Sequence, residues 1–264
     1  MLKEKYTTAC ELVREAGQLA HHYFSQRDKL AIEQKANPQD VATEADLQVE
    51  LLITERISAL YPEDGFFGEE SGYRSGTSKG IWLADPIDGT ANFIRGMAYY
   101  CVSLTYVEDG KIVIGAIYDP EQDELFAAMK DHGATLNGKP IAVSTSGWNQ
   151  AVVGLGRSER HPKACYPLAV ERLLASGAEY RRQGAGALSL AHVAAGRIDA
   201  YVEPHMNPWD ATAGLLIASE AGAVTLPYMD GDWHQGGIAY ASTPTIHQQL
   251  LTSSKEMVSG EFIL

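Results

Sequence analysis

The most informative stretch of the chain reads Trp82-Leu83-Ala84-Asp85-Pro86-Ile87-Asp88-Gly89-Thr90-Ala91-Asn92-Phe93. Its apolar start is typical of a buried strand that runs into Asp85, and Gly89 permits a tight turn. Across that turn we expect Asp85 and Asp88 to converge beside the Ile87 carbonyl, offering the oxygen ligands that Mg²⁺ prefers. A helix beginning near Thr90 would add free N–H groups for phosphate oxygens. For this stretch alone, an ordinary Asp-rich turn is the alternative.

Two further segments carry acids in a distinctive setting. The first is Phe67-Gly68-Glu69-Glu70-Ser71-Gly72, and the second is Asn207-Pro208-Trp209-Asp210-Ala211-Thr212-Ala213-Gly214. Neighbouring residues of a strand point opposite ways, so we expect one of Glu69 and Glu70 to reach a metal and the other to stand behind it. Asp210 falls in the first turn of a predicted helix. Taken singly, these acids are equally explained by surface charge and by the helix dipole.

Hydrophobic periodicity predicts two halves with different patterns. Residues 1–147 form an α+β half that carries most of the acids, with helices near 12–24 and 43–60, a loop or loose hairpin at 27–42, and strands at 81–84, 101–107, 112–118 and 125–129. Residues 148–264 form an α/β half with Asp210, in which strands at 151–155, 178–182 and 198–202 alternate with helices near 161–176, 186–195 and 209–221. We expect two sheets packed with helix layers in one compact unit, with the site between the halves.

Composition excludes several classes of protein. The 264 residues are 45% hydrophobic, enough for a sizeable core, and 34 acidic against 21 basic residues give a net charge of −13. Such a charge disfavours binding to nucleic acid and to anionic membranes. The start of the chain has no apolar signal core, and no run of about 18 apolar residues occurs. Three widely spaced cysteines fit reduced thiols, and we therefore expect a cytoplasmic protein.

In order and spacing, the three acidic segments together resemble the signatures of the inositol monophosphatase family, and the resemblance extends from Lys35 to Gly222. It implies a layered αβαβα sandwich of the α+β class and a lithium-sensitive phosphatase that acts on a small phosphorylated metabolite. It also implies a homodimer with two or three Mg²⁺ ions in each site.

The same resemblance assigns roles to individual residues. The metal ligands would be Glu69, Asp85, the Ile87 carbonyl, Asp88 and Asp210, with Lys35 on a loop near the metals. The catalytic residues would be Asp46 and Thr90, which activate the attacking water, and Glu70, which orients water at the metals. The substrate contacts would be Gly89, Thr90, Gly186, Glu203 and Asp210. Without the resemblance, Lys35 and Glu203 are indistinguishable from surface residues, and Asp46 from an acid on a helix face.

The substrate stays open at this point. The motifs look most like the branch that hydrolyses inositol-1-phosphate to myo-inositol and phosphate, while histidinol phosphate and 3′-phosphoadenosine 5′-phosphate are alternatives on the same metal core. Gly184-Ala185-Gly186-Ala187-Leu188 replaces the family's usual Gly-Thr/Ser-Ala-Ala-Leu beside the substrate, which puts its identity in doubt. A regulatory binding protein that kept the fold is the alternative from another class, because some bacterial relatives act on the transcription machinery.

Overall fold

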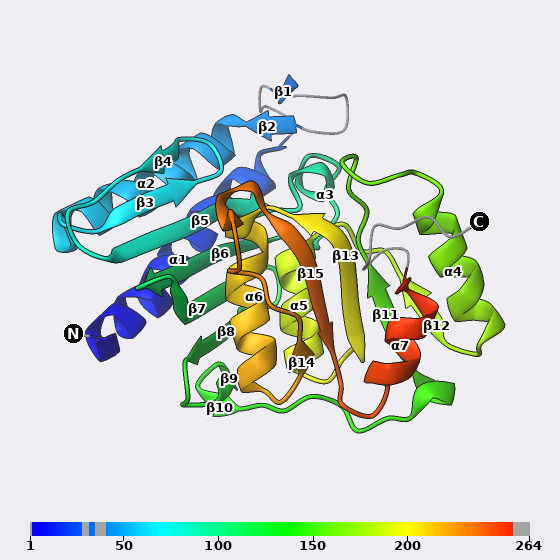
Figure 1. Ribbon diagram of the computed structural model, residues 1–264. Coiled ribbons are helices and arrows are strands. Elements are labelled where there is room, and N and C mark those ends of the chain that lie inside the picture. Colours follow the sequence, from blue (N-terminus) through cyan, green and yellow to red (C-terminus); the bar gives the residue numbers. More distant parts are fainter. Residues whose placement is uncertain (1, 28–31, 35–40, 256–264) are drawn as a thin grey trace.

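Five alternating layers of helix and sheet make up the molecule (Figure 1). The computed structural model describes residues 2–27, 32–34 and 41–255. The expected αβαβα sandwich is confirmed: two outer helix layers enclose two sheets, and a helix pair lies between the sheets. No helix in the described ranges is long and apolar enough to cross a membrane.

The larger sheet has eight strands in the order β10-β9-β8-β7-β6-β5-β3-β4. Its members are β3 (Gly65–Gly68), β4 (Gly72–Arg74), β5 (Gly80–Asp88), β6 (Cys101–Glu108), β7 (Lys111–Asp119), β8 (Glu124–Met129), β9 (Ala134–Leu136) and β10 (Lys139–Pro140). Only β3 and β5 pair in parallel. Helices cover both faces, so the central strands show near-continuous burial instead of alternation; every residue of β6 before Glu108 is buried.

The first outer layer contains α1 (Leu2–Ser25) and α2 (Glu44–Leu60). Helix α1 buries one stripe at helical spacing against β6 and β7, consisting of Ala9, Leu12, Val13, Ala16, Ala20 and Phe24. Before α2, the short strands β1 (Ile32–Gln34) and β2 (Val41–Thr43) pair antiparallel, so of the two alternatives for 27–42 the hairpin is the one observed.

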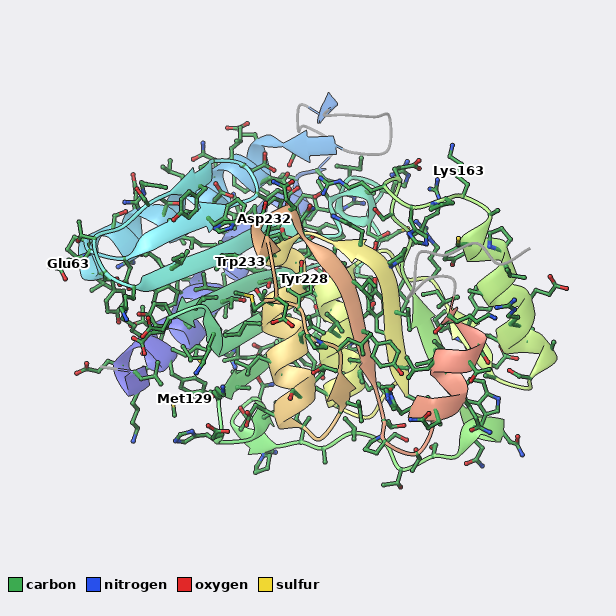
Figure 2. All side chains as sticks on the ribbon, viewed as in Figure 1. Glu63, Met129, Lys163, Tyr228, Asp232 and Trp233 are labelled. Atoms are coloured by element: carbon green, nitrogen blue, oxygen red, sulfur yellow. The ribbon has the colours of Figure 1, made fainter. Side chains whose placement is uncertain are left out.

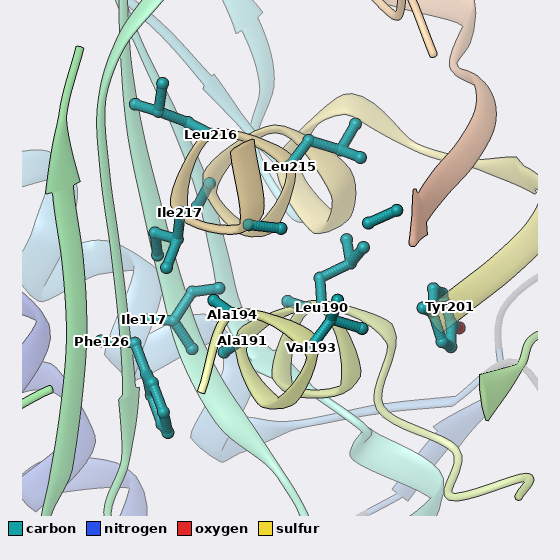
Figure 3. Close-up of a cluster of buried hydrophobic side chains, with 14 of the residues drawn as sticks. Ile117, Phe126, Leu190, Ala191, Val193, Ala194, Tyr201, Leu215, Leu216 and Ile217 are labelled. Atoms are coloured by element: carbon teal, nitrogen blue, oxygen red, sulfur yellow. The ribbon is translucent and has the colours of Figure 1, made fainter. Parts of the chain in front are cut away.

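The middle layer consists of α5 (Gly186–Ala194) and α6 (Pro208–Glu220), which pack against each other and against both sheets. Figure 3 shows Leu190 of α5 on the side of α6, Ala191 on the side of Ile117 and Phe126 of the large sheet, and Val193 on the side of Tyr201 of the small sheet. Both helices are apolar almost all round, as a helix enclosed on every side must be. Their N-termini reach the site described below.

The smaller sheet has five strands in the order β12-β11-β13-β15-β14, namely β11 (Val152–Leu155), β12 (Glu179–Arg181), β13 (Ala200–Met206), β14 (Val224–Thr225) and β15 (Gly237–Ser242). Strand β11 pairs in parallel with β12 and β13. Helices α4 (Cys165–Ala175) and α7 (His247–Ser253) cover its outer face. The remaining short elements are α3 (Thr90–Ile94), η2 (Trp148–Gln150) and η3 (Trp233–Gln235). The large sheet ends at Pro140 and the small sheet begins at Val152, and we retain the division at residues 147 and 148 as a proposal.

Candidate metal and active site

Asp85 and Asp88 both lie on strand β5, next to the middle layer. The position of the turn differs from the expectation. The strand continues to Asp88 instead of ending at Asp85, and the turn follows at Gly89. Asp85 pairs with Ser103, and Asp88 pairs with Cys101. Between these two pairs β5 has one residue more than β6, which makes a β-bulge. In a regular strand, residues three apart face opposite ways, and the extra residue of a bulge brings both carboxylates to one face.

Gly89 has a structural requirement of its own. Its φ of 95° lies in the left-handed region, and an added Cβ would lie 3.0 Å from the Cβ of Ala185 and from the Tyr99 carbonyl oxygen. Only glycine fits that conformation without strain. It lets the chain pass from β5 directly into α3, which begins at Thr90 as expected.

Three carboxylates from distant parts of the chain meet beside β5. One oxygen from each of Glu69, Asp85 and Asp210 lies within 4.8 Å of the other two. Glu69 sits in the turn between β3 and β4, so the expectation that Glu69 and Glu70 alternate along a strand is wrong. Asp210 lies in the first turn of α6, as expected. Such a set of hard oxygen donors suits Mg²⁺.

The electrostatics of the three-carboxylate cluster (Glu69, Asp85 and Asp210) also fit a cation. Burial, followed by the negative charge of Glu69, raises the pKa of Asp85 well above its ordinary value, and the same two causes in the same order raise the pKa of Asp210. Like charges held together out of water disfavour ionisation, and a divalent cation between them reverses that effect. The residues present therefore fit a magnesium site.

This electrostatic strain predicts a magnesium- and pH-dependent stability. Without a divalent cation, the folded state retains protons on Asp85 and Asp210 that the unfolded chain releases above its carboxyl pKa of about 4. The native state then binds more protons, so stability falls as the pH rises from about 4 towards 7. Saturating Mg²⁺ displaces those protons. At about 100 times its Kd, a bound ion adds about 2.7 kcal/mol to the free energy of unfolding, which corresponds to roughly 5–10 °C in Tm.

Thermal unfolding in EDTA and in Mg²⁺ at pH 5.0 and pH 7.5 measures this effect. We expect the larger magnesium-induced rise in Tm at pH 7.5, with Na⁺ at matched ionic strength as the control. Equal Tm values in EDTA and Mg²⁺ at pH 7.5 would contradict a magnesium site at the three-carboxylate cluster.

Asp88 is held by the N-terminus of α5. Its Oδ1 accepts a hydrogen bond from the Gly186 N–H at 3.1 Å, and its Oδ2 accepts one from the Leu188 N–H at 3.2 Å. Burial raises the pKa of Asp88 to about 6, even though these amides favour the ionised form. Asp88 is not one of the three clustered carboxylates, so its role as a metal ligand stays a prediction.

The Cys101 thiol lies against the site. It donates a hydrogen bond to Asp88, with its Sγ 3.6 Å from Oδ2 of that residue. Burial, followed by the charge of Asp88, raises the pKa of the thiol well above its ordinary value. The thiol therefore remains protonated and a hydrogen-bond donor, which agrees with the expectation of reduced thiols.

Asp46 and Thr90 come together as the resemblance implies. The Thr90 hydroxyl lies 3.1 Å from Oδ1 of Asp46 and 2.9 Å from the Ile87 carbonyl oxygen. The other Asp46 oxygen accepts the Thr43 N–H and hydroxyl, both at 2.7 Å, because Thr43 and Asp46 form the capping box of α2. Asp46 is fully buried, and burial raises the pKa of its carboxyl.

Glu50, which the sequence reasoning missed, fixes the turn that carries Glu69 and Glu70. It is 3% exposed, and its carboxylate accepts the N–H of Glu70 at 2.9 Å and of Ser71 at 2.7 Å. A Cβ at Gly68 would lie 2.5 Å from this carboxylate, so the glycine is what lets Glu50 reach the turn. Its signal in the sequence is an acid on the apolar side of α2, next to Val49 and Ile53.

Replacing Glu50 with glutamine should therefore weaken magnesium binding. The glutamine NH₂ would face one of the two backbone N–H donors, so we expect about 1–3 kcal/mol less free energy of unfolding. Loss of a group that supports a metal ligand typically costs about 10- to 100-fold in affinity. Calorimetric titration measures the Mg²⁺ affinity of the variant. The control is Glu55→Gln, on the exposed side of α2. Wild-type affinity in Glu50→Gln would show that the turn needs no such support.

Aromatic packing joins the segments that carry Glu69 and Asp210. Trp209 and Phe67 meet edge-on with ring centroids 5.0 Å apart. Trp233 of η3 also meets Phe67 edge-on, with ring centroids 6.4 Å apart. Figure 2 shows Trp233 beside Asp232 and Tyr228, on the segment that leads into β15. These aromatic contacts hold the segments of Glu69 and Asp210 side by side. The two acids therefore need no attraction between them to stay together.

A cavity of about 520 Å³ opens next to the carboxylates. Its wall includes Asp88, Asp210, Gly186 and Glu203, four of the residues implied in metal or substrate binding. Oε2 of Glu203 accepts a hydrogen bond from the Tyr201 hydroxyl at 2.6 Å, and burial raises the pKa of Glu203 to about 7. Among the predicted site residues, only Lys35 lies outside the described residues.

Comparisons with known proteins identify the family and support the fold. The family model of the inositol monophosphatase family matches residues 1–259. A curated relative from Xylella fastidiosa, called Nus factor SuhB, is 34% identical over 88% of this chain and 85% of its own. The solved structure of a Thermotoga maritima IMPase superposes with a TM-score of 0.86 at 28% identity, covering 97% of this chain and 98% of that one.

A more distant solved structure contains the expected ion. It is described as an IMPase/NADP phosphatase complexed with Mg²⁺ and phosphate, and it matches with a TM-score of 0.80 at 24% identity over 96% of this chain and 95% of its own. At that identity it supports the fold alone. The family model and the curated relative carry the assignment, and this chain belongs to the inositol monophosphatase family.

Proposed function

We propose that the protein hydrolyses a small phosphate monoester in a magnesium-dependent reaction, with inositol-1-phosphate or a similar polyol phosphate as substrate. The observation that carries the proposal is the meeting of Glu69, Asp85 and Asp210 within 4.8 Å, with Asp210 also in the wall of a cavity of about 520 Å³. A cavity of that size suits a small metabolite. Carboxylates that hold a metal ion are occupied as its ligands, and water made more acidic at the magnesium would be the attacking group.

The chain would hold magnesium through Glu69, Asp85 and Asp210, with Asp88 and the Ile87 carbonyl as further ligands. Bound magnesium supplies positive charge that neutralises the phosphoryl oxygens, makes water more acidic and stabilises the leaving alkoxide. The β5 bulge and the first turn of α6 hold their carboxylates in place before substrate arrives. Prior placement of charge is what makes such stabilisation effective.

Thr90 and Asp46 would activate the attacking water. When the Thr90 hydroxyl donates to Asp46, its lone pairs are left to accept a hydrogen bond from water, and Asp46 can take up the proton that water loses. Burial raises the pKa of Asp46, which makes its carboxylate a stronger base. Glu70 would orient the water, since Glu50 fixes the backbone at that residue.

The alcohol part of the substrate would occupy the cavity. The Glu203 carboxyl lies in its wall and accepts a bond from Tyr201, so one oxygen remains to bind a substrate hydroxyl. Gly186 lies in the wall of the cavity, and its backbone and that of Gly89 would border the phosphoryl end. Homodimerisation, the number of magnesium ions and the absence of nucleic-acid binding stay predictions.

A second candidate role is that of a Nus factor, which rests on the name of the Xylella fastidiosa relative. The substitution Asp88→Asn separates the two roles. A binding role should survive this change in the interior of the site, whereas hydrolysis should fall by orders of magnitude.

The test of the proposed function is phosphate release from a panel of monoesters. The panel contains inositol-1-phosphate, histidinol phosphate, 3′-phosphoadenosine 5′-phosphate, fructose 1,6-bisphosphate and β-glycerophosphate, each assayed with Mg²⁺ and with EDTA. We expect magnesium-dependent release that favours a polyol phosphate. Release no higher than the EDTA blank for every member would reject the proposal.

A further inference from the structure

The cavity has a basic side that the proposed reaction does not use. Arg157, Arg160 and Arg182 line it, opposite in charge to Asp88, Asp210 and Glu203. Three guanidinium groups around one cavity are notable in a chain of net charge −13. They follow β11 and β12, which are parallel neighbours, so their loops leave the same edge of the small sheet. That edge is where open α/β sheets bind ligands.

Two of these arginines have no carboxylate partner in the described part of the chain. Arg157 is paired with Glu159. Arg160 donates instead to the Gln235 carbonyl oxygen at 3.2 Å, and its Nη1 lies 3.1 Å from His205 Nε2. Arg182 makes no hydrogen bond or ion pair within the described ranges, although its charge lowers the pKa of nearby Glu203. An unpaired guanidinium beside a ligand cavity is suited to bind an oxyanion of the ligand.

We propose that Arg160 and Arg182 form a binding subsite for a second phosphate group, so that among polyol phosphates a bisphosphorylated one is the preferred substrate. The proposal rests on the proposed function: the phosphoryl group to be hydrolysed occupies the carboxylate side of the cavity, and the second phosphate occupies the basic side. In a polyol with a single phosphate, the polyol part carries no charge. Such a substrate leaves both guanidinium groups without a counterion. Cationic monoesters such as histidinol phosphate would place an ammonium group near these arginines, which disfavours them.

Two substrates that differ by a single phosphate provide the test. We expect kcat/KM for inositol 1,4-bisphosphate to exceed that for inositol 1-phosphate by about tenfold, the equivalent of one charge-assisted contact. In Arg182→Gln, the ratio of the two kcat/KM values should fall about tenfold, towards one. The matched control is Arg181→Gln: this neighbour pairs with Glu179 outside the cavity, so its loss should leave the ratio unchanged.

The outcomes distinguish the subsite from the reaction. Magnesium-dependent release with equal kcat/KM for both substrates, or the same fall in ratio for Arg181→Gln, would overturn the subsite and leave the proposed function standing. If neither substrate releases phosphate, the proposed function fails, and calorimetric binding of inositol 1,4-bisphosphate decides the subsite. About tenfold weaker binding by Arg182→Gln than by Arg181→Gln supports it; equal binding overturns it.

Discussion

The substitution Asp85→Asn should lower kcat/KM for the preferred substrate by about 1,000-fold, because several kcal/mol of charge stabilisation depend on the magnesium it helps to hold. The carboxamide keeps the shape of the side chain, and its oxygen can still accept the Ile87 N–H, which donates to Oδ1 of Asp85 at 2.9 Å. What is lost is one of three clustered negative charges. Phosphate release at saturating Mg²⁺ measures the effect.

Two controls separate this loss from unfolding. Asp119→Asn changes another buried carboxyl whose pKa burial raises to about 6, outside the three-carboxylate cluster, and should leave activity near wild type. The Tm of Asp85→Asn in EDTA should equal or exceed that of the wild type, because the substitution removes a repelled charge. Activity within tenfold of wild type in a folded Asp85→Asn protein would remove Asp85 from the metal site.

The second large effect concerns the pair that would activate water. Thr90→Ala and Asp46→Asn should each lower kcat by about 100-fold or more, the typical contribution of a positioned general base. Thr90→Ala removes the hydroxyl that lies 3.1 Å from Asp46, and Asp46→Asn removes the group that accepts the proton. Steady-state kinetics at saturating substrate measure both, and KM should change little in comparison.

Thr90→Ser and the double variant test whether the two residues act as a unit. Thr90→Ser retains the hydroxyl and should recover most of the activity that alanine loses. The double variant should be little slower than either single variant, as expected for groups that share one proton path. Fully multiplied losses, or a serine variant as slow as alanine, would show that Thr90 and Asp46 act separately.

Local patterns were sufficient to predict two sheets with helix layers, whereas the αβαβα order and the roles of Asp46 and Glu203 followed only from the resemblance to the family. The apolar stripe of α1, the uninterrupted apolar residues of β6 and the Asp210 turn of α6 each follow from short-range periodicity. Boundaries were less accurate: α4 begins at Cys165 instead of 161, and β13 extends to Met206. Strand β15 and helix α7 were not predicted, since the turn-rich segment before them masks their pattern.

Long-range contacts account for what the sequence did not predict. The bulge between Asp85 and Asp88 exists only through pairing with β6, so the sequence suggested a turn in its place. Glu50 and the turn it holds are 20 residues apart, and nothing in α2 itself indicates that contact. Arg160 and Arg182 come together only because β11 and β12 are parallel neighbours.

The most direct test of the central claim is phosphate release from inositol-1-phosphate as a function of Mg²⁺ concentration, in wild type and in Asp210→Asn. The central claim is that the three-carboxylate cluster holds the magnesium on which hydrolysis depends. We predict saturable magnesium activation in the wild type, no release in EDTA, and a half-activating concentration at least about tenfold higher in Asp210→Asn. Release that is independent of Mg²⁺, or identical activation curves for the two proteins, would contradict the claim.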